Sequence, residues 1–279
     1  MIIFYHNDLD GRASAAAVAY SLSEYATDVV YVEVDYTHNI DSAIESIEAY
    51  ESIWILDFSF KPEVMAKVLE KTSDVVWIDH HKTAAAYDYG RELKGIRNFG
   101  EKETSGCELT WQYLYPGTDI PWCIQRIADR DCWRDPEAPD VKRFTMGMMA
   151  EDTSPDSMLW PILLCEAFED EKDIILKAGD TLLGYFEQAN QRMMEQDVYP
   201  LQFDGYNCLA VNRKGCGSQS FGDKLKDVDM AICYAYDGKH GKWKVTLYSV
   251  TTDVSVVAKA HGGGGHTGAA GFECATLPF

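Results

Sequence analysis

The stretch that decides the fold is residues 75–83, which read Val-Val-Trp-Ile-Asp-His-His-Lys-Thr. An apolar run that is typical of a buried strand ends here in an acid and two imidazoles, Asp79, His80 and His81. Open α/β sheets place their ligand sites at the carboxyl ends of their strands, and these side chains bind metals or anions. The stretch therefore predicts a strand that delivers functional groups at its C-terminal end.

Two earlier segments have the same form. Residues 2–5 are apolar and lead into His-Asn-Asp-Leu-Asp-Gly at 6–11, and residues 53–56 are apolar and lead into Asp57. Helical patterns lie between the apolar runs, and this alternation predicts a doubly wound, mainly parallel sheet. We expect the three strand ends to meet at one edge of that sheet.

The first of these segments carries three candidate ligands at alternate positions. His6, Asp8 and Asp10 would face the same side of the chain if the segment stayed extended. We expect a turn at Asp10-Gly11-Arg12 and a helix of small residues from Ala13 onward.

The remainder of the chain divides by its pattern. Residues 1–150 are expected to form the N-terminal α/β domain, 151–200 a helical linker, and 201–279 a smaller α/β domain of short strands. A helix is expected over 120–127, just before the acids Asp129 and Asp131, and a loop over the proline- and acid-rich residues 135–140.

Charge and cysteine usage bound the function. Lys and Arg number 25 and Asp and Glu number 45, a net charge of −20, which argues against a long nucleic-acid surface. No window of about 18 uncharged apolar residues occurs and no basic leader precedes the first strand, so we expect no membrane span and no signal peptide. The 8 cysteines form no C-x-x-C pair, which indicates free thiols and a cytoplasmic setting.

A glycine run near the end of the chain has two interpretations. Residues 262–265 are all glycine, and His266 and the small residues 268–271 follow. The run is either a flexible connector or a place where backbone amides approach a phosphate closely, with His266 as an anion ligand.

The strand-end side chains predict a metal centre. His6, His80 and four carboxylates would converge from separate segments, which is too much negative charge to pack without cations. The carboxylates are Asp8, Asp10, Asp57 and one of Asp129 and Asp131. Mixed carboxylate and imidazole ligation suits two divalent ions, with Mn²⁺ favoured and Mg²⁺ as the alternative. Two such ions are a usual device for in-line attack on phosphorus.

These motifs resemble those of the DHH phosphoesterase superfamily, which includes RecJ-like exonucleases, nanoRNases and family II pyrophosphatases. The resemblance rests on residues 6–11, on Asp57, on the Asp-His-His at 79–81, on Asp129, and on the Gly-Gly-Gly-His at 263–266 with Ala-Ala-Gly at 269–271. The resemblance spans nearly the whole chain. The motif at residues 6–11 and the overall order of the motifs are most similar to the nanoRNase and oligoribonuclease branch.

The resemblance implies a role for each matching residue. One ion would be held by His6, Asp8 and Asp57, and the other by Asp10, Asp57, His80 and Asp129, with Asp131 as the alternative to Asp129. The catalytic set would be Asp57, His81 at the scissile phosphate and Asp79 orienting the neighbouring imidazole. Gly263, Gly264, Gly265 and His266 would bind the far end of the substrate in a cleft between the two domains.

One departure from the family pattern concerns the C-terminal domain. Many relatives carry an arginine in a Leu-Arg-Ser segment that contacts a substrate phosphate, whereas residues 247–249 here are Leu-Tyr-Ser. Arg213 and Lys259 are the candidates for that contact.

The expected function is therefore a metal-dependent phosphodiesterase. Its expected substrates are short oligoribonucleotides (nanoRNA), phosphoadenosine phosphate (pAp) or linear dinucleotides, and long nucleic acids and membranes are not expected partners. Two alternatives are a phosphoanhydride hydrolase acting on pyrophosphate or short polyphosphate, and a nucleotide-binding sensor with residual activity. A homodimer is left open.

Overall fold

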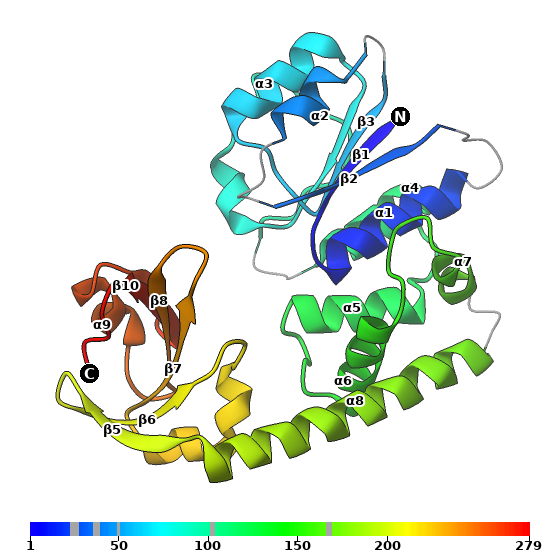
Figure 1. The fold of residues 1–279 in the computed structure, drawn as a ribbon. Coiled ribbons are helices and arrows are strands. Elements are labelled where there is room, and N and C mark those ends of the chain that lie inside the picture. Colours follow the sequence, from blue (N-terminus) through cyan, green and yellow to red (C-terminus); the bar gives the residue numbers. More distant parts are fainter. Residues whose placement is uncertain (23–27, 36–39, 49–50, 101–103, 166–168) are drawn as a thin grey trace. The chain divides into compact units, whose positions relative to one another are not determined.

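The computed structural model describes residues 1–22, 28–35, 40–48, 51–100, 104–165 and 169–279. The chain divides into two compact units, residues 1–183 and 184–279, each with its own sheet (Figure 1). The helices and strands of the first unit are β1 Ile2–His6, α1 Leu9–Leu22, β2 Val30–Val34, α2 Asp41–Glu45, β3 Ile53–Leu56, α3 Pro62–Lys71, β4 Val75–Ile78, the 3-10 helix η1 Lys82–Ala86, α4 Gly106–Leu114, α5 Trp122–Asp131, α6 Pro139–Gly147, the 3-10 helix η2 Met148–Ala150 and α7 Leu159–Leu164.

The helix α8, Glu169–Gln196, contains the division between the two units. The helices and strands that follow it are β5 Tyr199–Phe203, β6 Tyr206–Asn212, the 3-10 helix η3 Ser218–Asp227, β7 Met230–Asp237, β8 Lys242–Tyr248, α9 Val254–Ala260, β9 Gly264–His266 and β10 Ala269–Cys274.

The sheet of the first unit has, over the described residues, four parallel strands in the order β2-β1-β3-β4. The chain leaves β1 toward β2 on one side and returns to build β3 and β4 on the other. This order creates a topological switch point between the carboxyl ends of β1 and β3, where open α/β sheets bind ligands. The predicted parallel sheet is confirmed.

Helices cover both faces of this sheet, as a doubly wound fold requires. Alternate residues of each strand point to opposite faces, so Ile2 and Phe4 of β1 pack with α2 and α3, while Ile3 and Tyr5 pack with α1 and α4. The strands are therefore apolar on both sides, which explains their continuous hydrophobic runs. Figure 1 shows α3 and α1 on opposite sides of the sheet.

Helix α1 begins earlier than the sequence pattern predicts. Asp10 and Gly11 are helical and do not form the expected turn, because the Asp8 carboxylate accepts a hydrogen bond from the Gly11 amide at 2.9 Å and starts the helix there. A Cβ at Gly11 would lie 2.2 Å from the His6 carbonyl oxygen, so the close approach of α1 to β1 requires glycine.

Two helices beyond residue 120 also differ from the prediction. Helix α5 continues to Asp131 and so carries both acids that were expected to follow it. Helix α6 begins at Pro139, inside the segment predicted as a loop, because proline is well suited to the first turn of a helix.

The second unit, residues 184–279, is described throughout and contains a six-stranded sheet in the order β5-β6-β7-β8-β10-β9. The β6–β7 pair is parallel and the other pairs are antiparallel. One sheet face packs against α9 in a core that includes Ile232, Leu247 and Val257. A second, smaller α/β sheet domain is therefore confirmed.

The last two glycines of the run, Gly264 and Gly265, lie in β9, which pairs with β10 in an antiparallel hairpin. A Cβ at Gly263 would lie 2.1 Å from the Gly271 carbonyl oxygen, and Gly265 has φ +144° and abuts Ala270. Close backbone packing therefore requires glycine at these two positions, and the flexible-connector interpretation is wrong.

Within the described ranges, no helix combines the length and the apolar character needed to cross a lipid bilayer.

Candidate metal centre

Three strand ends deliver the predicted side chains to one place. Tyr5 of β1 is level with Leu56 of β3, and Leu56 is level with Ile78 of β4. The residues that follow, His6, Asp57 and Asp79, therefore emerge side by side at the switch point. The sequence prediction that these strand ends meet at one sheet edge is confirmed.

The carboxylate of Asp57 lies at the centre of the cluster and is only 1% exposed. Its Oδ1 is 3.1 Å from His80 Nε2, and its Oδ2 is 3.6 Å from His6 Nδ1. Among the described residues, neither oxygen has a partner with hydrogen-bond geometry. Burial raises the pKa of Asp57, and the two imidazoles act in the opposite direction. A buried carboxylate without hydrogen bonds is costly, and a cation at this point would satisfy it.

The backbone at Asp57 is strained in a way that aims its side chain. Asp57 has φ +53°, a left-handed conformation that is uncommon for residues other than glycine. Helix α4 begins directly against it, since a Cβ at Gly106 would lie 2.5 Å from Asp57 Cβ. Glycine at position 106 thus permits the N-terminus of α4 to close over the carboxylate.

His6 and Asp8 form the first group of candidate ligands with Asp57. His6 Nδ1 lies 2.6 Å from Asp8 Oδ2, and ligand atoms of His6, Asp8 and Asp57 all lie within 4.8 Å of one another. Burial disfavours the charged imidazole, but the neighbouring carboxylates of Asp57 and Asp8 raise the pKa of His6 to about 10. The two carboxylates beside His6 therefore favour positive charge at this point.

His80 is the centre of a second group. Its Nε2 lies 3.4 Å from Asp131 Oδ2 and 3.7 Å from Asp10 Oδ2, and a ligand group is formed by His80, Asp131 and Cys132. Burial opposes protonation, but contacts with Asp57, Cys132 and Asp10 raise the pKa of His80 to about 12. Sequence reasoning missed Cys132, since no spacing rule distinguishes it from the other free thiols.

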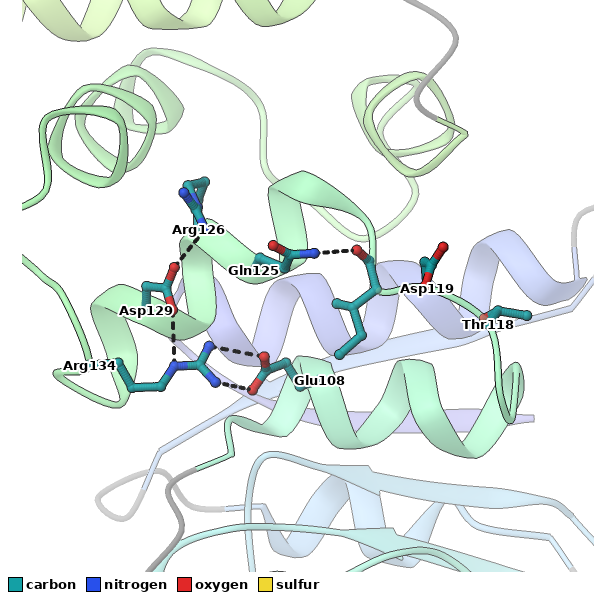
Figure 2. A pocket seen from close by; sticks show the side chains of 8 residues that line it. Glu108, Thr118, Asp119, Gln125, Arg126, Asp129 and Arg134 are labelled. Atoms are coloured by element: carbon teal, nitrogen blue, oxygen red, sulfur yellow. Dashed lines mark hydrogen bonds and ion pairs between the residues drawn. The ribbon is translucent and has the colours of Figure 1, made fainter.

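Asp129 and Asp131, which the sequence offers as alternative ligands, have different partners in the structure. Asp131 reaches His80, whereas Asp129 points to two arginines, with 2.8 Å to Arg126 and 3.0 Å to Arg134 (Figure 2). Both acids lie on α5, and helical residues two apart point about 200° away from each other. Only one of them can therefore face the cluster.

Asp10 reaches the cluster by a route that the sequence did not predict. It lies on α1, so the expectation that it extends alongside His6 and Asp8 is wrong. Its two oxygens accept hydrogen bonds from the amides of Gly106 and Cys107, at 2.7 and 2.9 Å, at the N-terminus of α4. Such amides stabilise an anion. Burial, followed by the nearby Asp57, raises the pKa of Asp10 to about 7.

Asp79 lies behind the histidines and holds one of them. It is fully buried, accepts hydrogen bonds from the amides of His80 and His81, and lies 2.7 Å from His81 Nδ1. The Ser59 hydroxyl also donates to Asp79. These contacts fix the orientation of the His81 ring, as carboxylates commonly do behind metal-site histidines.

The remaining predicted residues lie in the second unit. Gly263 precedes β9, Gly264, Gly265 and His266 form it, Arg213 follows β6, and Lys259 lies on α9. The side chains of Arg213, Lys259 and His266 are exposed to solvent.

The fold and the cluster define an α/β domain with a carboxylate and imidazole centre at its switch point. Residues 1–130 match the family model described as "DHH family, N-terminal domain".

Other similar proteins match this chain over both units. The uncharacterized protein R106 of Acanthamoeba polyphaga mimivirus is 25% identical over 305 residues, which span 100% of this chain and 69% of R106. The pGpG-specific phosphodiesterase PggH of Vibrio cholerae is 12% identical with a TM-score of 0.55, over 98% of this chain and 92% of PggH. A RecJ exonuclease bound to manganese is 14% identical with a TM-score of 0.53, over 98% of this chain and 85% of RecJ. The two solved structures share the fold of this chain.

Proposed function

We propose that this chain is a metal-dependent phosphodiesterase that hydrolyses short oligonucleotides or small nucleotides, such as nanoRNA, pAp or linear dinucleotides. The observation that carries the proposal is the carboxylate of Asp57, which is buried at the switch point between two imidazoles without a hydrogen-bond donor among the described residues. The DHH family domain supports it, as does a fold shared with a phosphodiesterase and an exonuclease.

The donor set fits two divalent ions that share Asp57. One would be held by His6 and Asp8 and the other by His80 and Asp131, with Asp10 beside the second. Oxygen and nitrogen donors in this mixture suit Mn²⁺, with Mg²⁺ as the alternative. Such ions supply a water of lowered pKa and neutralise charge on a phosphoryl oxygen.

The chain's own residues position the phosphate. Asp79 holds His81 through Nδ1, so Nε2 is the nitrogen with which His81 would contact the scissile phosphate. Burial opposes protonation of His81, but the hydrogen bond to Asp79 raises its pKa, which favours a cationic ring against an anionic substrate.

We expect substrate contacts from the second unit as well. His266→Ala should raise KM for a dinucleotide and leave the affinity for Mn²⁺ unchanged, because an interaction made equally in the ground and transition states is lost mainly in KM. Steady-state kinetics and Mn²⁺ titration measure the two effects. His240→Ala, in an exposed turn of the same unit, is the matched control. Loss of bound Mn²⁺ in His266→Ala would contradict this assignment.

The distribution of cations favours a short substrate. Each phosphate of a long strand requires cationic partners, and the net charge is −20. The local cluster of basic side chains over residues 126–143 is largely neutralised by carboxylates. The pairs are Arg126 with Asp129 and Asp140, Arg134 with Glu108 and Asp129, Lys142 with Glu137, and Arg143 with Asp180.

The length dependence of hydrolysis tests the proposal. We expect kcat/KM to be highest for substrates of two to about five nucleotides. A plot of log kcat/KM against log salt concentration should have a slope of magnitude about 1–2, because side chains neutralise few phosphates. RNAs of about 2, 5, 10 and 25 nucleotides, with pyrophosphate alongside, are assayed with Mn²⁺ at two salt concentrations. Equal or faster hydrolysis of the longest RNA would place the protein with long-strand exonucleases. Preference for pyrophosphate would favour a phosphoanhydride hydrolase, and Mn²⁺ binding without hydrolysis would favour a sensor.

A further inference from the structure

Two side chains of the candidate metal centre are held from outside the sheet. Asp10 accepts hydrogen bonds from the first amides of α4, and Asp131 reaches His80 from the C-terminal end of α5. Neither helix end belongs to the strand ladder that positions His6 and Asp57. Contacts between α4 and α5, and not the strand ladder, therefore set the distance between these two helix ends.

Arg134 bridges the two helix ends. Its terminal nitrogens donate to both oxygens of Glu108 on α4, at 3.0 and 2.9 Å, and its Nε lies 3.0 Å from Asp129 Oδ1 on α5 (Figure 2). The bidentate geometry uses the planar guanidinium fork, which lysine cannot reproduce. These groups line an open pocket of about 610 Å³.

Each end of the Arg134 bridge lies close in the chain to a residue that contacts the candidate metal centre. Glu108 follows directly after Cys107, whose amide holds Asp10, and it is buried in a capping box with Ser105. Asp129 lies two residues before Asp131 on the same helix. A change in the Arg134 contacts would therefore move the groups that hold Asp10 and Asp131.

The turn that follows α5 is closed by the same residues. The Arg134 amide donates to the Asp129 carbonyl at 3.1 Å, and Trp133 between them has φ +54°. A bulky residue persists in this conformation only when its surroundings impose it. The side-chain and backbone contacts of Arg134 thus act together on the end of α5.

We propose that Arg134 and Glu108 are positioning residues that set the metal affinity of the half-site containing His80 and Asp131. The proposal rests on the proposed function, because it assigns the centre to divalent ions. Arg134 carries out no chemistry itself; it fixes two helix ends whose side chains would bind one ion.

The test measures Mn²⁺ binding directly, by electron paramagnetic resonance of the free ion, together with kinetics and thermal unfolding of the full chain. In Arg134→Lys we expect the dissociation constant of the Mn²⁺ ion at the His80 and Asp131 half-site to rise by about tenfold or more. Changes of this size are usual when a residue that supports a metal ligand is mutated. We expect kcat to fall and KM for a dinucleotide to stay near the wild-type value. Glu108→Gln should show the same pattern, and the double variant Glu108→Gln/Arg134→Lys should lose no more than the worse single one, because both act through one bridge.

Arg143→Lys is the matched control. Arg143 makes a bidentate pair with Asp180, at 2.7 and 2.7 Å, away from the centre in the same unit. We expect this variant to bind Mn²⁺ as the wild type does. If Arg134→Lys and Glu108→Gln bind two ions with wild-type affinity, or lose thermal stability alone, the positioning role is wrong. If the wild-type protein itself binds no Mn²⁺, the proposed function fails instead.

Discussion

Asp57→Asn is expected to lower kcat/KM by more than about a hundredfold while the protein stays folded. The substitution removes the shared charge between His6 and His80 but keeps the shape of the side chain. Asparagine also tolerates the left-handed backbone found at position 57, where alanine would add strain. Hydrolysis of a dinucleotide and Mn²⁺ titration measure the loss of activity and of bound ions.

The same variant should unfold at an equal or higher temperature than the wild type when both are stripped of metal. Asp57 is buried without a hydrogen-bond donor among the described residues, so its charge destabilises the metal-free protein. Asp74→Asn, which removes an exposed acid paired with Lys94, is the control and should leave activity unchanged. Retention of more than about a tenth of wild-type activity in Asp57→Asn would contradict a shared ligand.

The second large effect is expected from Asp131→Asn, with Asp129→Asn as its counterpart. The Asp131 carboxylate lies 3.4 Å from His80. Burial and the nearby Asp10 raise the pKa of Asp131 to about 7, so a cation beside this carboxylate would stabilise its charged form. We expect Asp131→Asn to abolish binding of one Mn²⁺ ion and to lower kcat by more than about a hundredfold.

Asp129→Asn should have a smaller effect, because Arg134 keeps its two bonds to Glu108 when the third contact weakens. We expect a decrease in kcat of about tenfold or less, with two Mn²⁺ ions still bound. Parallel kinetics and metal titration of the two variants separate the roles. If Asp129→Asn abolished binding of an ion and Asp131→Asn did not, the choice of Asp129 made from the sequence would stand.

Much of the first unit could be predicted because the information is local. Each apolar run forms one strand, and the polar residues directly after it must emerge at the carboxyl end of that strand. For this reason the convergence of His6, Asp57 and Asp79 required no knowledge of the packing. The antiparallel partner of the glycine run was not predicted, since strand pairing depends on residues that are far apart in the chain.

Helix boundaries were the weaker part of the prediction, and they mattered for the site. The early start of α1 turned Asp10 away from the line of His6 and Asp8 and toward the amides of α4. The extension of α5 to residue 131 decided which acid faces His80. Both outcomes follow from the phase of a helix, which advances by about 100° per residue and so depends on where the helix begins and docks.

The sequence by itself determined the parallel sheet, the switch-point residues and the chemical nature of the centre, because these depend on residue type and on spacing within single segments. Only the tertiary structure decided that Asp131 and Cys132 lie beside His80, that α4 holds Asp10, and that Arg134 joins Glu108 to Asp129. Most of these contacts join segments that are far apart in the chain: Glu108 and Arg134 are separated by 26 residues, and Asp10 and Gly106 by 96. Their geometry is set by how the helices pack on the sheet, and no local pattern encodes that packing.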